Sequence, residues 1–456
     1  MQEKHISSQA LTEQKPLFTG RALVALILPL MVEQLLAVTV GMADTLMVSG
    51  CGEAAVSGVN LVDSINILLI QLFAAMATGG AVVCSQYIGK GEPGNASHAA
   101  KQLLYCTTFF ALLLMTIAIL LNQNILSLVF GSVEESVMGN AKIYFYYSAM
   151  SYPFLAIYNA TAAFFRSMGK SRITLYISIL MNLINVSGNA LLIYGFQMGV
   201  AGAAIATLIS RAVAAVLGML LICRPGYPIH INRLFQYRPD WKALGKILAV
   251  GIPTGLESSM FQLGKVMLSS LISTFGTAAI AANAMVNNLA GFSNVPGGGI
   301  GLGMITVVGQ CMGAGRPEDA KKYAKKLLLA TYLFMGSVDV ILFVLAEPLC
   351  GLYHLSEEAT VLGILLIQEF VFATVFWPVS FTIPNALRAA GDAKFTMVIS
   401  LISMFVCRVA LAYLLAYTTD LGLRSVWIAM YADWVVRGIF FLVRFVRGKW
   451  LQKKVI

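Results

Sequence analysis

The sequence predicts an all-helical membrane protein with twelve transmembrane helices in two similar halves, and three observations lead to this prediction. Of the 456 residues, 58% are hydrophobic and 11% are charged, with a net charge of +10; soluble domains carry about a quarter charged residues. Polar segments divide the chain into long apolar runs, and residues of the first half recur in the second. So large an apolar excess cannot be buried in a soluble core, which excludes most soluble enzymes.

A helix that crosses a bilayer needs about 20 predominantly apolar residues, and twelve runs meet this need. The expected spans of the first half are Ala22–Val48, Ala54–Ser85, Leu103–Leu121, Ile143–Phe164, Ile173–Tyr194 and Val200–Cys223. Those of the second half are Leu244–Thr274, Ala278–Gln310, Ala324–Ala346, Val361–Ala386, Phe395–Tyr417 and Val426–Val446. We therefore expect one lobe over residues 21–223, a linker over 224–243 and a second lobe over 244–446.

The charged residues orient these spans. Basic residues gather in alternate connecting segments, among them Lys4, Lys15, Arg166, Arg233 and Arg388. The opposite loops carry mostly acids, with Lys142 and Arg424 as their basic residues. Because Lys and Arg accumulate on the cytoplasmic side, we expect both tails, 1–20 and 447–456, in the cytoplasm of a protein of the cell membrane. A nucleic-acid partner would need these charges on one surface, so we expect none.

The chain is an internal duplication. Ten residues of the first half are identical to the residue 224 positions later: Pro29, Glu33, Gly52, Ala54, Ala55, Gly79, Gln86, Gly89, Gly91 and Pro93. The register then slips slightly, so that Arg166 and Gly169 match Arg388 and Gly391. Six spans per half make the repeats parallel in the membrane. Repeats of this kind are typical of secondary transporters, whose binding sites lie between the lobes near the midplane.

The repeated residues resemble a known family. The stretches LPLMVEQLLAVTVGMADTLMVSGCGEAAVSG and SQYIGKGEP, with their second-half counterparts GIPTGLESSMFQLGKVMLSSLISTFGTAAIAAN and GQCMGAGRPEDAKKYAKK, are similar to the multidrug and toxic compound extrusion (MATE) family. The resemblance implies a transporter, not an enzyme, that exports organic cations or amphipathic compounds in exchange for H⁺ or Na⁺. It implies no cofactor besides this coupling ion, and it is closer to the DinF-like than to the NorM-like branch.

Two carboxylates of the first helix are candidates for ion coupling. Glu33 and Asp44 lie eleven residues apart, which is three helical turns, so they share a face with Pro29. A proline inside a helix tends to bend it, and intramembrane acids usually face a bundle interior or a watery cavity. This pattern suits a proton- or sodium-linked gate. The resemblance assigns coupling to Asp44 and helix bending to Pro29.

The fifth span carries Asn182, Asn185 and Asn189 on one face, because they are three and four residues apart. Their amides would bind a cation or a carboxyl group, or would only fasten helices together. The resemblance places Asn185 and Asn189, with Thr207, beside Asp44, where a Na⁺ site would comprise Asp44, Asn185 and Asn189. Part of the DinF-like branch has Asp where this chain has Asn189, which disfavours a relay of two carboxylates.

The second half lacks the acids of the NorM-like branch: one of their positions is Phe261, and no Asp lies near the tenth span. Glu257 is the counterpart of Glu33, and Lys265 follows two turns later. We expect a Glu257–Lys265 tie, with a second ion site as the alternative.

The remaining acids and polar residues give weaker signals. For Asp339, Glu369 and Asp433 we expect either a position nearer the membrane interface or structural pairing with Lys265, Arg408, Arg211 or Arg437. The expected substrate-cleft residues are Gln34, Asp63, Asn66, Glu257 and Lys265.

Two other functions remain open. A flippase for a lipid-linked precursor would have more spans and a cationic cleft, and the sequence indicates neither. A channel or receptor without ion coupling gives no reason for two equivalent lobes. The expected partners are therefore small molecules and the lipid bilayer, and we expect a monomer.

Overall fold

The computed structural model describes residues 16–131, 133–232, 234, 236 and 238–456, and all regular secondary structure in these residues is helical. Lys4, Lys15 and Arg233 lie outside the described residues. The first helices are α1 (Gly20–Ser49), α2 (Glu53–Gly89), α3 (Pro93–Leu120), α4 (Asn122–Phe130), α5 (Glu135–Ser167), α6 (Ser171–Asn189) and α7 (Gly199–Ile222). They are followed by α8 (Trp241–Ser273), α9 (Thr277–Gly313), α10 (Pro317–Val344), α11 (Ala346–Gly351), α12 (Glu357–Ala373), α13 (Ile383–Ala389), α14 (Ala393–Ile402), α15 (Leu411–Thr418) and α16 (Leu423–Val446).

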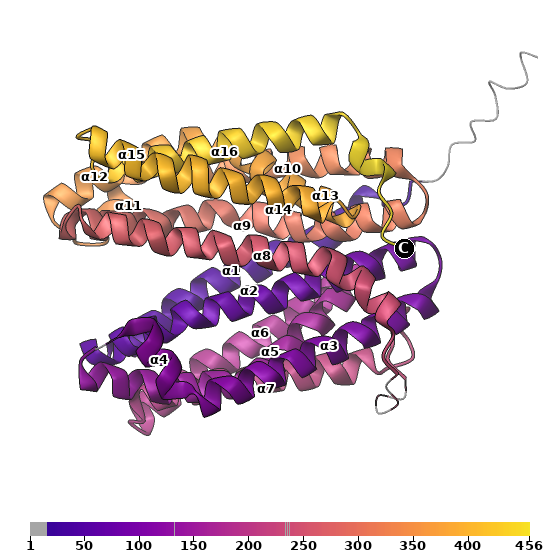
Figure 1. The fold of residues 1–456 in the computed structure, drawn as a ribbon, viewed down its shortest axis with the longest axis horizontal. Helices are drawn as coiled ribbons and strands as arrows, with labels where there is room; N and C mark the ends of the chain where they lie inside the picture. Colours follow the sequence, from indigo (N-terminus) through magenta and orange to yellow (C-terminus); the bar gives the residue numbers. More distant parts are fainter. Residues whose placement is uncertain (1–15, 132, 233, 235, 237) are drawn as a thin grey trace, which may run out of the picture.

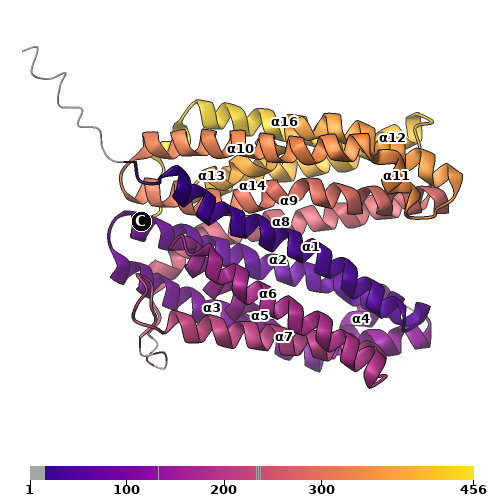
Figure 2. The ribbon, with the colours of Figure 1, turned by 180° about the vertical axis from the view of Figure 1, so that it is seen from behind.

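The helices form two groups that lie side by side. Helices α1–α7 make one group and α8–α16 the other, and the two come together near the C-terminus and diverge where α4 and α11 lie (Figures 1 and 2). We call these the closed end and the open end. Between the groups, α2 packs along α8 and α9, and α1 packs along α9.

Ten helices within the described residues are long and apolar enough to cross a membrane, which confirms a multi-pass membrane protein. The two expected spans outside this set are Ile143–Phe164 and Leu244–Thr274, which lie in α5 and α8. Both helices have 33 residues, which is ample for a span. They fall short in hydropathy, because α5 is rich in Tyr, Ser and Asn, and α8 carries Glu257 and Lys265.

The duplication extends to local structure. Helices α2 and α9 have 37 residues each, α3 and α10 have 28 each, and the short α4 and α11 occupy corresponding places. The glycines that precede α2 and α9, Gly52 and Gly276, have φ angles of 99° and 91°. Only glycine adopts such angles readily, so the same turn opens both helices.

Proline interrupts one predicted span. The run Val361–Ala386 forms α12, a 3₁₀ turn, the π-helical segment η3 (Pro378–Thr382) and α13. Pro378 and Pro384 lack the N–H that a continuous helix needs. Two further π-helical segments are η1 (Ala190–Gly195) after α6 and η4 (Ser403–Ala410) after α14. Such segments are frequent at functional sites.

At the closed end, the two groups meet through a reciprocal contact of α2 and α9. A Cβ atom added to Gly89 would collide with the carbonyl oxygen of Gln310, and one added to Gly313 would collide with that of Gln86. The side-chain Nε2 of Gln86 donates to the Ala389 carbonyl at 2.7 Å, and that of Gln310 donates to the Ser167 carbonyl at 2.7 Å. The backbones can approach this closely only because both crossing residues are glycine.

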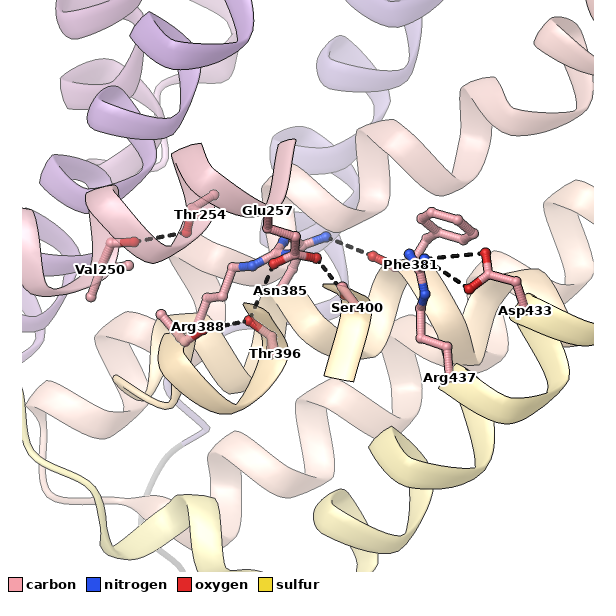
Figure 3. Close-up of polar contacts among 11 residues, drawn as sticks. Val250, Thr254, Glu257, Phe381, Asn385, Arg388, Thr396, Ser400, Asp433 and Arg437 are labelled. Atoms are coloured by element: carbon pink, nitrogen blue, oxygen red, sulfur yellow. Dashed lines mark hydrogen bonds and ion pairs between the residues drawn. The ribbon is translucent and has the colours of Figure 1, made fainter. Parts of the chain in front are cut away.

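Each group also contains a buried ion pair at matching positions. In the first, Arg166 Nη2 lies 2.6 Å from Glu33 Oε1, and the Thr174 hydroxyl donates to Glu33 Oε2 at 3.1 Å. In the second, Arg388 Nη2 lies 2.7 Å from Glu257 Oε1, and Ser400 Oγ donates to the same oxygen at 2.7 Å (Figure 3). These pairs tie α1 to α5 and α6, and α8 to α13 and α14.

The expected Glu257–Lys265 tie is therefore wrong. Glu257 turns toward Arg388, its partner across the bundle, rather than toward the lysine two turns along its own helix. The two arginines, which the sequence placed among the loop charges, instead neutralise buried carboxylates.

The glycine contact predicts a sharp difference among Gly→Ala variants. Gly89→Ala and Gly313→Ala should each destabilise the protein by about 1–3 kcal/mol, because the new methyl group has no space between the helices. Gly94→Ala and Gly139→Ala are matched helical controls with nothing within 4 Å of the new Cβ. They should leave stability unchanged or raise it slightly. Thermal unfolding of the purified protein in detergent measures this, and equal effects at all four sites would contradict it.

The buried ion pairs predict a second stability difference. Glu33→Gln and Glu257→Gln should each cost about 3–5 kcal/mol, because either change leaves a buried arginine without its counter-ion. Glu92→Gln removes a solvent-exposed carboxylate that pairs with Lys90, and exposed pairs contribute little. Denaturation in detergent compares the three variants. If Glu33→Gln proved as stable as Glu92→Gln, the tie between α1 and α5 would not be structural.

Candidate functional site

The first group encloses a polar cavity of about 180 Å³ toward the open end. Its walls come from α1, α2, α5, α6 and α7. It is lined by Gly41, Asp44, Thr45, Val48, Val56, Val59, Asn60, Asp63, Tyr144, Asn189, Ala203, Thr207 and Arg211. We call it the acidic cavity, because its charged groups are two carboxylates and one guanidinium.

Asp44 sits in this cavity against two asparagines of α6. Asn189 Nδ2 donates to Asp44 Oδ1 at 2.7 Å. One terminal atom of the Asn185 amide lies 2.8 Å from Asp44 Oδ1 and 3.2 Å from Oδ2, and the other lies 3.1 Å from Thr207 Oγ1. Asn185 and Asn189 are buried. Asp44, Asn185, Asn189 and Thr207, which the sequence and the resemblance placed together, are thus in contact.

The Asn185 amide is oriented by its two neighbours. Its NH₂ group donates to the Asp44 carboxylate and its oxygen accepts from the Thr207 hydroxyl, the orientation in which both ends of the amide are satisfied. Carboxylate and amide oxygens are also ligands that suit a hard cation. No group of three or more His, Cys, Asp or Glu side chains among the described residues forms a metal site.

Asp63 occupies the far wall of the same cavity, although the sequence placed it in a cleft between the lobes. Asn66 Nδ2 donates to Asp63 Oδ1 at 3.2 Å, and the Tyr152 hydroxyl donates to Asn66 Oδ1 at 2.9 Å. The nearby Arg211 donates to Ser151 Oγ at 2.7 Å. Asp63 and Asn66 therefore belong to the first group of helices.

Other predicted residues lie elsewhere. Glu33 is committed to Arg166 and does not line the acidic cavity. Asn182 donates to Ser178 Oγ at 3.4 Å, one turn away from the Asp44 contacts. Gln34 lies against Gly298 of α9, at the contact between the groups. Pro29 is buried within α1, which continues as one helix from Gly20 to Ser49.

Sequence reasoning missed several residues of the acidic cavity, among them Tyr144 and Arg211. Tyr144 of α5 lines the cavity, and Arg211 was expected only as a structural partner for intramembrane acids. Arg211 gave a usable signal, because it is a basic residue inside a predicted span and needs a polar environment. Tyr144 gave none, because tyrosines are common along α5.

Among the second-half acids, Asp433 pairs with Arg437 at 3.0 Å and with Arg408 at 3.7 Å, which confirms the expected pairing. Glu369 forms an ion pair with Arg424 rather than with any of the four expected basic residues. Asp339 has a different kind of partner, because it accepts a hydrogen bond from Ser293 at 2.5 Å.

Most of the lining of another cavity comes from the second group, with Gln71 of α2 added from the first, and its charged residues are mainly cationic. This cavity, of about 280 Å³, lies beside the buried pair of Figure 3, and its charged residues are Glu257, Lys265, Arg388 and Arg437. The expectation that no cationic cleft exists is therefore wrong. The sequence did not reveal it because these charges come from three distant segments of the chain.

A third cavity, of about 500 Å³, lies between the groups. Its walls come mainly from α1 and α9, with Tyr353 at one side. It shares Gly41 and Thr45 with the acidic cavity. We call it the central cavity. A molecule in it would lie next to the Asp44 site.

Comparison with known proteins agrees with this architecture. The MatE family model matches residues 29–191 and again residues 253–414, once in each half. The chain is 28% identical to a probable multidrug resistance protein NorM of Thermotoga maritima, over 96% of this chain and 94% of that protein. It is 27% identical to the uncharacterized transporter YisQ of Bacillus subtilis, over 96% of this chain and 97% of that protein.

Solved structures share the fold. An outward-facing multidrug resistance MATE family transporter superposes with a TM-score of 0.89 at 20% identity, over 95% of this chain and 96% of that chain. A MATE structure in a straight conformation gives the same TM-score at 20% identity, over 95% and 97%. Because the family model matches well over half of the chain, this protein belongs to the MATE family, whose members named here are transporters and not enzymes.

Proposed function

We propose that this protein is a multidrug exporter that exchanges organic cations or other amphipathic compounds for H⁺ or Na⁺. The observation that carries this proposal is the Asp44 carboxylate, held by Asn185 and Asn189 in a cavity that adjoins the central cavity. A carboxylate inside the membrane is energetically costly, so its presence usually indicates a functional site. Relatives named as probable multidrug resistance proteins support the same activity.

In the proposed cycle, binding of H⁺ or Na⁺ at Asp44 changes the conformation of α1. Binding of a proton or Na⁺ at Asp44, Asn185 and Asn189 removes its negative charge and changes its contacts with α6. The proposed bend at Pro29 would then alter the part of α1 that lines the central cavity. Substrate would leave as that cavity is reshaped. Gln34, Asp63, Asn66, Glu257 and Lys265, which do not line the central cavity, are proposed contacts elsewhere along the path of the substrate. A ligand shifts such an equilibrium only by its differential affinity for the two states.

We propose further that α5 and α8 also cross the membrane, which gives twelve spans. The lobes would be residues 21–223 and 244–446, joined by a linker over 224–243. The closed end would face the cytoplasm with both tails, 1–20 and 447–456, because the basic residues gather there. We propose that the protein is a monomer and that it lies in the cell membrane. Phe261 and the position of Asp44 favour the DinF-like branch, with coupling in the first lobe.

A second candidate function is a flippase for a lipid-linked precursor. The cationic lining around Lys265, Arg388 and Arg437 favours it, because such precursors carry phosphate groups. A channel or receptor without ion coupling has no comparable support.

Transport in vesicles tests the coupling proposal. Purified protein in liposomes should extrude a fluorescent organic cation when a pH or a Na⁺ gradient is imposed, and the gradient that works identifies the ion. Asp44→Asn should reduce gradient-driven flux by about ten-fold or more, since this change removes the titratable charge. Asp420→Asn, which changes an exposed loop acid, is the matched control and should keep full flux.

Two results would overturn this proposal. One is an absence of flux under either gradient by protein that remains folded. The other is full gradient-driven flux by Asp44→Asn, which would remove Asp44 from the coupling mechanism.

A further inference from the structure

The second group contains a cavity that is the structural counterpart of the acidic cavity. It has a volume of about 190 Å³ and is lined by Lys265, Leu268, Ser269, Ile272, Asn283, Asn287, Arg408, Val426, Trp427 and Met430. Six of these residues lie 224 positions after residues that occupy the same places in the first half: Gly41, Asp44, Thr45, Val48, Val59 and Asp63. The duplication therefore produced two equivalent cavities.

Their charges are opposite. Asp44 and Asp63 of the acidic cavity correspond to Leu268 and Asn287, so both carboxylates are replaced by neutral side chains. Lys265 stands where the first half has Gly41. Together with Arg408 it gives the second cavity two cationic groups, and no acidic residue lines it among the described residues. We call it the basic cavity.

Arg408 is only partly neutralised within the protein, because it shares its acidic partner with Arg437. Its side chain is 10% exposed, and its Nε atom has no hydrogen-bond partner among the described residues, as is also true of the Nε atoms of Arg166, Arg388, Arg424 and Arg437. The neighbouring acid, Asp433, is already bound by Arg437 at 3.0 Å and 3.1 Å and by Ser403 Oγ at 2.5 Å. Arg408 reaches Asp433 only at 3.7 Å. A buried guanidinium with an unused donor requires an acceptor.

We propose that the basic cavity binds an oxyanion, a carboxylate or a phosphate, carried on an apolar body. Lys265 and Arg408 supply the charge, and the amides of Asn283 and Asn287 and the hydroxyl of Ser269 supply further polar contacts. Arginine suits both anions because its planar fork pairs with two oxygens at once.

The apolar part of the ligand follows from the rest of the lining. Leu268, Ile272, Val426, Trp427 and Met430 form an apolar wall beside the cations. The Trp427 indole is oriented by its hydrogen bond to Asn283 Oδ1 at 3.2 Å. Asn287 also lines the central cavity, so the ligand has a route between the groups. If the protein exports drugs as proposed above, an amphipathic acid or zwitterion would be a substrate; the binding itself does not depend on that function.

Calorimetry on the purified protein in detergent tests the proposal. The probes are 1-naphthoate and 1-naphthyl phosphate, with 1-naphthylmethylammonium as the cation of matched ring. Both anions, or one of them, should bind more tightly than the cation, and the preferred anion identifies the head group. Lys265→Gln should weaken anion binding by about ten-fold or more, and Lys265→Arg should retain it. Lys142→Gln, which removes a lysine at a distant site, is the control and should bind as the unchanged protein does.

Arg408→Gln provides an independent variant, provided that it elutes as a folded species, and it should weaken anion binding to a similar extent. Lys265 is exposed, so Lys265→Gln decides the question if Arg408→Gln does not fold. The proposal is overturned if neither anion binds, if the cation binds as tightly, or if Lys265→Gln leaves anion binding unchanged. Because no gradient is applied, this result is separate from the vesicle experiment: anion binding is measured whether or not Asp44 couples flux to an ion.

Discussion

The arrangement of the whole molecule depends on the contact of two helix backbones at Gly89 and Gly313. Each glycine faces the carbonyl of a glutamine on the opposite helix, at a separation that no side chain would permit. Gln86 and Gln310 then complete the contact with hydrogen bonds to the opposite group. The groups are in close contact at this end and diverge toward the other (Figure 1). The three cavities that involve α1 or the first turns of α9 all lie toward that open end.

Much of this fold was predictable from the sequence. Hydropathy located the helices, and the constant spacing of Pro, Gly, Gln and Glu revealed the two halves. Helical periodicity placed Asn185 and Asn189 on one face of their helix, and only the family resemblance placed them beside Asp44. The partner of Glu257 could not be predicted in this way, because helical periodicity relates residues on one helix, whereas Arg388 lies on another helix. The duplication held the missing information, since Glu33 and Arg166 recur together as Glu257 and Arg388.

The two halves have kept the same structural contacts but differ in the charge of their cavities. The buried Glu–Arg pairs and the glycine crossings are the same in both, and these features hold helices together. The cavities differ in charge, because the positions of Asp44 and Asp63 carry Leu268 and Asn287 in the second half. Charge in a cavity comes from side chains on several helices. A sequence read one helix at a time therefore does not reveal the sign of that charge.

The hydrogen bonds of Gln86 and Gln310 make the interface between the two halves nearly symmetric. Gln86 binds the carbonyl of Ala389, and Gln310 binds that of Ser167, the corresponding residue of the first half. An interface in which each partner offers the same surface to the other is isologous, the form found in dimers of identical subunits. The segment between α7 and α8 joins the two halves in one chain, and a covalent connection of this kind raises the effective concentration of each half for the other. With that connection in place, the halves were free to lose their identity, as the opposite charges of their cavities illustrate, without losing their association.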